Sequence, residues 1–219
     1  MGRAVPTRVG TAVTWASVGI GQFHTCATRT DHTVWCWGRN ADGQLGLGNA
    51  GDGTERLVPT RVGAGTSWAA VSLGGWHTCA LRTTHTLWCW GSNALGAVGV
   101  AGPNRSTPTR VGTVSTWATV SVGSDHSCAT RTTHTLWCWG ANYDGQLGLS
   151  SGLMRSAPTQ VGSAVTWAAL GAGQAHTCAT RRDHSLWCWG TTRRVSSVSA
   201  RPLGNAHRPG WERPPPGAA

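Results

Sequence analysis

The sequence predicts an all-β protein, a β-propeller with four blades in this chain. One segment, from His-Thr/Ser-Cys-Ala to Trp-Cys-Trp-Gly, occurs four times, at 24–38, 77–91, 126–140 and 176–190. The closing glycines are 53, 49 and 50 residues apart, a period typical of stacked supersecondary units. Four short strand-like stretches with glycines between them fill each period, and no helical periodicity competes with them.

Each unit is expected to begin with a strand that a tryptophan opens, at Trp15, Trp68, Trp117 or Trp167. In the second unit Ala69, Val71 and Leu73 should share one strand face, because side chains alternate at period two. Two or three loop residues then lead into the second strand.

The second and third strands of each unit should form a hairpin of defined register. Cys26 and Cys36 lie symmetrically about Asp31, which pairs the cysteines and leaves 30–32 as a three-residue loop. Such loops usually close with a residue in the left-handed region; the residues at this position are His32, His85, His134 and His184. Histidine tolerates positive φ, so we interpret these four as turn residues rather than as a ligand ring or a pH sensor.

A glycine-rich loop, such as Gly38–Gly48, leads to a last strand of pattern Pro-Thr-x-Val. The proline should be its first residue, where a missing N–H costs little. Four such strands are expected, at 6–9, 59–62, 108–111 and 158–161. The first of them could pair with the fourth unit and close a ring, but we favour an open arc. The exposed blade faces of an arc would carry Trp and Leu and promote self-association.

All eight cysteines lie in the repeated hairpins. Opposed residues of an antiparallel pair approach closely enough for a disulfide, so we predict the pairs Cys26–Cys36, Cys79–Cys89, Cys128–Cys138 and Cys178–Cys188. Disulfides indicate an oxidising compartment, and we expect an extracellular or cell-surface location. Two alternatives stay open: free thiols in a cytosolic protein, and zinc bound by His24, Cys26 and Cys36, which would lack a fourth ligand.

Two further sets of repeated residues are interpreted as structural, His24, His77, His126 and His176, and Trp37, Trp90, Trp139 and Trp189. A catalytic site is usually built once, so four identical histidines suggest a hydrogen bond made in every unit. Both faces of a blade pack on neighbours, which favours a core position for these indoles over a sugar-binding surface. We find no nucleophile–base pair and no carboxylate cluster, and expect no enzyme activity, cofactor or metal.

These motifs resemble the RCC1 (regulator of chromosome condensation) repeat family. The carriers are Gly-x-x-His-Thr-Cys-Ala, Trp-Cys-Trp-Gly-x-Asn and Gly-Gln-Leu-Gly, seen at Gly21–Gly46 and Gly123–Gly148, and the resemblance covers 5–190. The paired cysteines resemble a bacterial extracellular branch. The resemblance implies a propeller usually of seven four-stranded blades, of which four would be a partial ring. Family members exchange nucleotide on a small GTPase, bind chromatin or serve as binding scaffolds, so the fold does not fix the function.

The chain departs from the family pattern in three places. Gly96-Ala97-Val98-Gly99 replaces Gly-Gln-Leu-Gly, histidine replaces the glycine common in the hairpin turn, and the fourth unit stops at Gly190. We expect a propeller domain at 1–190, with units of about 10–62, 63–111, 112–161 and 162–190 and an N-terminal strand at 5–9, then a disordered tail rich in Arg, Pro and Ser at 191–219. The abrupt change suggests a frameshift. No secretory signal is visible, so we expect one upstream of Met1.

The formal net charge is +10, and all 18 basic residues are arginine. Arginines recur at two repeat positions, Arg29, Arg82, Arg131 and Arg181, and Arg8, Arg61 and Arg110. They could form a ring that contacts nucleic acid. Because no aromatic residues are interleaved with these arginines and no nucleic-acid motif is present, we favour the interpretation that they lie on a solvated rim of the blades. No stretch has the length of a membrane span.

The leading hypothesis is a non-enzymatic extracellular scaffold that binds a protein partner through rim loops such as 41–58 and 141–157. One alternative is a guanine-nucleotide-exchange-type regulator of a small GTPase or a chromatin binder. Another is a propeller that binds or acts on polysaccharide. The sequence does not identify the partner.

Overall fold

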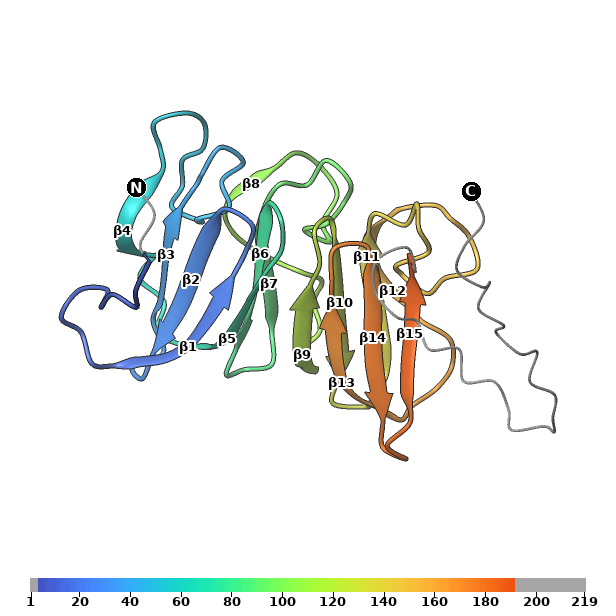
Figure 1. Ribbon diagram of the computed structural model, residues 1–219. Helices are drawn as coiled ribbons and strands as arrows, with labels where there is room; N and C mark the ends of the chain where they lie inside the picture. The colour runs from blue at the N-terminus through green and yellow to red at the C-terminus, as the bar shows by residue number, and fades with distance from the viewer. Residues whose placement is uncertain (1–3, 192–219) are drawn as a thin grey trace, which may run out of the picture.

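The computed structural model describes residues 4–191, which form fifteen strands in four antiparallel sheets and contain no helix. The sheets stand side by side as the blades of a propeller (Figure 1). Blade 1 contains β1 (Trp15–Ile20), β2 (His24–Arg29), β3 (Val34–Gly38) and β4 (Arg56–Arg61). Blade 2 contains β5 (Trp68–Leu73), β6 (His77–Arg82), β7 (Leu87–Gly91) and β8 (Arg105–Arg110). Blade 3 contains β9 (Trp117–Val122), β10 (His126–Arg131), β11 (Leu136–Gly140) and β12 (Arg155–Gln160), and blade 4 contains β13 (Trp167–Ala172), β14 (His176–Arg181) and β15 (Leu186–Gly190).

The predicted fold class and hairpin register are confirmed. Cys26 lies opposite Cys36 and Thr28 opposite Val34, and the other three blades repeat this pairing. The four hairpin histidines have φ of 58–64°, in the left-handed region as predicted. All eight cysteines form the four predicted disulfides, with Cα atoms 4.1 Å apart in each. Oxidised sulfurs leave no thiolate for zinc, so the zinc and free-thiol alternatives are wrong for this structure.

The prediction for the last strand of each blade was wrong in its start. The strand begins three residues before the proline, so Pro59 is the fourth residue of β4 rather than the first. The ladder with β3 is irregular at this point: Thr60 lies opposite Cys36, and the next pair is Arg56 with Gly38. The missing proline N–H therefore falls in a bulged stretch of an outer strand, where no ladder bond is lost.

The strand predicted at 5–9 does not form, because residues 6–9 have no ladder partner. Blade 4 is consequently three-stranded among the described residues, and the arrangement is an open row rather than a closed ring (Figure 1). The tail predicted at 191–219 lies outside the described residues, apart from Thr191.

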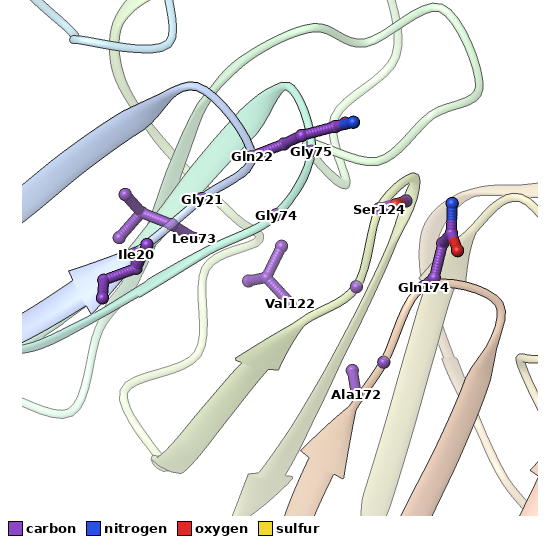
Figure 2. A pocket seen from close by; sticks show the side chains of 12 residues that line it. Ile20, Gly21, Gln22, Leu73, Gly74, Gly75, Val122, Ser124, Ala172 and Gln174 are labelled. Atoms are coloured by element: carbon purple, nitrogen blue, oxygen red, sulfur yellow. The ribbon is translucent and has the colours of Figure 1, made fainter. Parts of the chain in front are cut away.

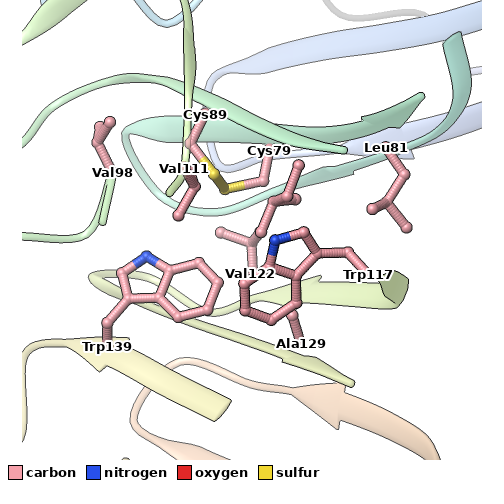
Figure 3. Close-up of a cluster of buried hydrophobic side chains, with 10 residues drawn as sticks. Cys79, Leu81, Cys89, Val98, Val111, Trp117, Val122, Ala129 and Trp139 are labelled. Carbon is pink, nitrogen blue, oxygen red and sulfur yellow. A yellow bond between two sulfur atoms is a disulfide. The ribbon is translucent and has the colours of Figure 1, made fainter. Parts of the chain in front are cut away.

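Three buried clusters hold the blades together, one at each junction. We call the blade face turned to the preceding blade its front and the other face its rear. In the junction of blades 2 and 3, the rear Cys79–Cys89 disulfide and Leu87 pack against the front residues Trp117 and Trp139 (Figure 3). The junctions before and after it repeat this composition. Each blade is too thin to bury both faces alone, so its hydrophobic stabilisation comes from its neighbours.

Candidate functional site

The two ends of the blades differ in what they expose. Because His24 lies opposite Gly38, the short loop 21–23 and the long loop 39–55 emerge at the same end of blade 1. We call this the loop end; it also carries the long loops 92–104 and 141–154. The opposite hairpin end carries the three-residue turns. The predicted partner-binding loops 41–58 and 141–157 thus begin at the loop end and run into β4 and β12.

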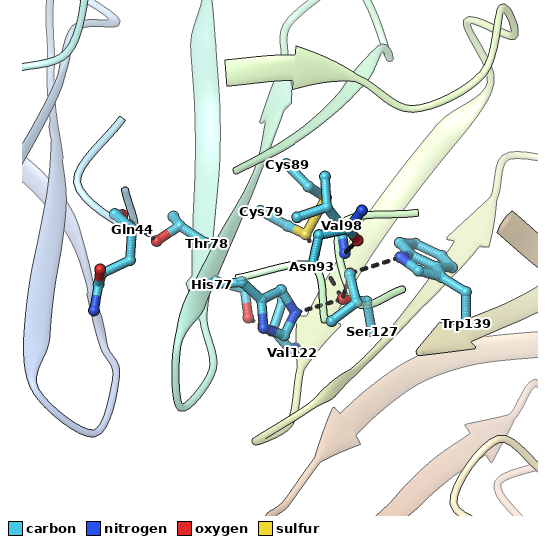
Figure 4. The surroundings of a disulfide bond; sticks show 12 residues. Gln44, His77, Thr78, Cys79, Cys89, Asn93, Val98, Val122, Ser127 and Trp139 are labelled. Carbon is cyan, nitrogen blue, oxygen red and sulfur yellow. Dashed lines mark hydrogen bonds between the residues drawn. A yellow bond between two sulfur atoms is a disulfide. The ribbon is translucent and has the colours of Figure 1, made fainter. Parts of the chain in front are cut away.

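The repeated histidines and tryptophans meet at the blade junctions. His77 Nε2 is 2.8 Å from Ser127 Oγ in the next blade, and that hydroxyl donates to the Ala97 carbonyl at 2.9 Å (Figure 4). Trp139 Nε1 donates to the same carbonyl at 2.9 Å. The carbonyl belongs to the Gly-x-x-Gly loop of the preceding blade, so one buried oxygen joins two blades.

The same network recurs with different side chains. His24 pairs with Thr78 and His126 with Thr177, and the acceptor carbonyls are those of Gln44 and Gln146. Because the acceptor is a backbone oxygen, the departure to Gly-Ala-Val-Gly in the second unit preserves the network. Three of the four predicted histidines therefore make the cross-blade bond; His176 has no following blade among the described residues.

Burial keeps these histidines uncharged. It lowers the pKa of His24 and His126 to about 4 and that of His77 to about 3. The imidazole of His126 also requires the glycine three residues before it, since a Cβ on Gly123 would lie 2.2 Å from the ring. A neutral, enclosed ring that donates or accepts one bond is suited to holding blades together, not to proton transfer with a substrate.

A buried asparagine anchors each long loop. Asn40 Oδ1 accepts from Leu45 N at 3.0 Å, and its Nδ2 donates to the Asn49 carbonyl at 3.0 Å. Asn93 and Asn142 hold their loops in the same way. The long loops are therefore fixed at the base, which presents their tips as a preformed surface.

Several exposed aromatic and apolar residues lie at the loop end. Phe23 is 46% exposed and packs on Trp76, with ring centroids 5.0 Å apart, and the Arg39 guanidinium lies 4.9 Å from the Trp76 ring. On the third loop Tyr143 is 72% and Leu153 69% exposed. We call Phe23, Arg39 and Trp76 the loop-end aromatic cluster.

The sequence reasoning missed this cluster. The position before each repeated histidine is occupied by Phe23, Trp76, Asp125 and Ala175, so it varies inside an otherwise uniform motif. That variability was the available signal.

A hollow of about 380 Å³ lies at the loop end of the four innermost strands (Figure 2). Each blade contributes three equivalent residues to it, 20–22, 73–75, 122–124 and 172–174. The lining contains glycine, apolar residues, two glutamines and a serine, with no titratable side chain. It therefore offers shape and backbone groups but no acid, base or nucleophile.

The hairpin end places each repeated arginine on two indoles. The Arg29 guanidinium lies 4.6 Å from the Trp15 ring and 3.9 Å from the Trp35 ring, and Arg82, Arg131 and Arg181 repeat this arrangement. These guanidiniums are half-buried cation–π partners. The solvated-rim interpretation is therefore wrong for this set of arginines, although Arg61 and Arg110 are exposed.

The hairpin histidines also connect blades, which the sequence reasoning did not anticipate. His85 Nδ1 is 3.1 Å from the Trp117 carbonyl, and Trp117 N donates to the His85 carbonyl at 3.0 Å. His32 and His134 make the same pair of contacts with Trp68 and Trp167. Within residues 4–191 no cluster of His, Cys, Asp or Glu could hold a metal ion. No helix in that range could cross a membrane.

Fold and motifs together define a propeller of repeated four-stranded blades. The regulator of chromosome condensation (RCC1) repeat matches at 31–81, 85–130 and 134–180, and a second description of the same repeat matches at 15–44, 68–97 and 117–146. The chain belongs to the RCC1 repeat family.

Relatives share the repeat over part of their length. A human protein named probable E3 ubiquitin-protein ligase HERC6 is 38% identical over 89 residues, 40% of this chain and 8% of that protein. The X-linked retinitis pigmentosa GTPase regulator homolog of Caenorhabditis elegans is 37% identical over 86 residues, 38% of this chain and 6% of its own length. The chain thus spans less than a tenth of either relative.

Solved structures confirm the fold. Human WBSCR16 is 25% identical with a TM-score of 0.78, over 90% of this chain and 55% of that one. Yeast RCC1 (Prp20), solved bound to Kap60, is 19% identical with a TM-score of 0.74, over 83% and 45%. At 19% identity, the similarity to yeast RCC1 shows a shared fold and nothing about function.

Proposed function

We propose that the chain is a non-catalytic, extracellular scaffold that binds a protein partner at its loop end. The loop-end aromatic cluster carries the proposal. Aromatic residues and arginine dominate the binding energy of protein interfaces. Here the guanidinium of Arg39 lies over the rings of both Phe23, which is exposed, and Trp76, which is half-buried, at the loop end.

The difference between recurring and variable positions in the repeat supports a partner-binding surface at the loop end. The recurring cysteines, histidines and tryptophans lie at the blade junctions, whereas the position before each repeated histidine, at the loop end, differs from unit to unit. A uniform scaffold with variable loops is how repeat proteins present a specific surface. The four disulfides favour the oxidising compartment, where such crosslinks persist.

Site-specific photo-crosslinking tests the proposal. A benzophenone amino acid is placed at Phe23, at Tyr143, or at Leu57 on the outer strand of blade 1, and the protein is added to the outside of the cells that produce it. We expect one protein to be crosslinked from positions 23 and 143 and not from position 57, and Trp76→Ser to reduce its yield at least tenfold. Identical products from all three positions, or no product, would refute the proposal.

A regulator of nucleotide exchange on a small GTPase is the second candidate, favoured by the name of the nematode relative. It predicts that the chain accelerates release of labelled GDP from a GTPase, and that reduction of the disulfides does not affect this rate. GDP release that stays unchanged across a panel of purified small GTPases would exclude it.

A further inference from the structure

The chain carries half of a blade junction at each end of its row of blades. Ile20, on the front of blade 1, is 75% exposed, whereas its counterparts Leu73 and Val122 are 7% and 5% exposed. Leu186, on the rear of blade 4, is 63% exposed, whereas Leu87 and Leu136 are 0%. The two exposed faces are the two partners of the interface that occurs three times inside the chain.

The front of blade 1 contains a ready-made hollow. It has a volume of about 330 Å³ and is lined by Val9, Trp15, Val18, Ala27 and Trp37 among others. In the first internal junction the counterparts Val62, Trp68, Ala80 and Trp90 form a buried cluster with Val34. Leu186 occupies the Val34 position in blade 4, so it is the side chain that this hollow fits.

The outer edge of blade 4 matches an unused strand of the chain. Within residues 4–191, β15 pairs only with β14, whereas β3, β7 and β11 each have an outer strand. Residues 3–8 read Arg-Ala-Val-Pro-Thr-Arg, and β4 reads Arg-Leu-Val-Pro-Thr-Arg. The described part of this segment, from residue 4 onward, lies beside blade 1, at the opposite end of the row from β15 (Figure 1).

We propose that a second copy of the chain docks head to tail, front of blade 1 onto rear of blade 4, and lends its N-terminal segment to β15. Applying the β3–β4 register, Thr7 of the second copy lies opposite Cys188 and Arg8 opposite Trp187, and Val9 N donates to the Leu186 carbonyl. His176 Nε2 of the first copy then forms a hydrogen bond with Thr25 Oγ1 of the second copy, as His24 does with Thr78 inside the chain. The docking adds a strand to a sheet edge and buries two apolar faces at once.

Sedimentation velocity of the chain across micromolar concentrations tests the proposal, with two variants and a matched control. Ile20→Asp alters the front and Leu186→Asp the rear, each at an exposed side chain. Circular dichroism checks that both variants keep the fold of the unaltered chain. Leu57→Asp, at a side chain 92% exposed on β4, is the control. We expect the unaltered chain and Leu57→Asp to associate as concentration rises, and each of the other two variants to weaken association at least tenfold.

Mixing the two variants distinguishes the head-to-tail arrangement from others. Ile20→Asp keeps an intact rear and Leu186→Asp an intact front, so an equimolar mixture should form a dimer, although neither associates alone. Deletion of residues 1–8 should weaken association of the otherwise unaltered chain. A chain that stays monomeric, association that survives either single substitution, or a mixture that remains monomeric would overturn the proposal.

Discussion

Individual residues at the blade junctions perform paired tasks, one within the blade and one across it. His85 closes its hairpin at φ 58°, and its ring also reaches the backbone of blade 3. Glycine would be the easier residue at that φ, so the repeated histidine is explained by the second task. His184 has the same φ region, at 64°, but no described blade follows it.

The pair His85→Gly and His184→Gly separates these two tasks. We expect His85→Gly to lower the free energy of unfolding by about 1 kcal/mol, because it removes a hydrogen bond between blades. His184→Gly should be neutral or slightly stabilising, because only the backbone strain changes. Urea unfolding followed by tryptophan fluorescence measures both, and equal effects would show that the ring contact contributes nothing.

At the scale of elements, the hairpin is the local unit and the junction is the non-local one. The hairpin register, the disulfides and the left-handed turn could be predicted from the sequence because they depend on residues about ten positions apart. The junction network could not, since its partners are 30 and 50 positions apart and one acceptor is a backbone carbonyl without a sequence signature. Phe23 and Trp76 were missed because a variable position has no periodicity.

The start of the outer strand was missed for a related reason. Proline is a strong local signal for a strand boundary, but the bulge that accommodates Pro59 inside β4 depends on the pairing with β3. The N-terminal segment also shows that strand formation depends on a pairing partner as well as on sequence. Its sequence is that of a strand, yet 6–9 form none, because the chain itself places no partner beside it.

The position of a hairpin in the row should determine what its disulfide contributes. We compare the double variants Cys79→Ala/Cys89→Ala and Cys178→Ala/Cys188→Ala. Both lose about 3 kcal/mol of loop-closure stabilisation, but Cys79 and Cys89 are fully buried between two blades, so their removal also leaves a cavity. Urea midpoints should therefore fall further for the blade 2 variant. A larger loss for the blade 4 variant would contradict the packing argument.

The whole molecule should lose stability as the pH falls from 7 toward 5. The pKa values of His24, His77 and His126 are lowered to between about 3 and 4 in the folded protein, whereas an unfolded histidine titrates near 6.5. Above pH 6.5 both states carry neutral imidazole and these residues add no pH dependence. Below it the unfolded chain binds more protons, so the free energy of unfolding falls by about 1.4 kcal/mol per pH unit for each histidine until the folded pKa is reached.

The carboxylates with shifted pKa values differ in the direction of their contribution to stability. The pKa values of Asp31 and Asp183 are held below their usual range by hydrogen bonds from Thr33 and Ser185, so their contribution is lost only at more acidic pH. Burial raises the pKa of Asp125, whose protonation in the folded state would stabilise the fold as the pH falls, opposite in sign to the histidines. Urea midpoints at pH 7, 6 and 5 measure the slope, and His77→Gln should make it shallower by about one third. A flat profile between pH 7 and 5 would mean that the junction histidines are protonated in the folded protein, and the neutral hydrogen-bonded network across the blades would have to be abandoned.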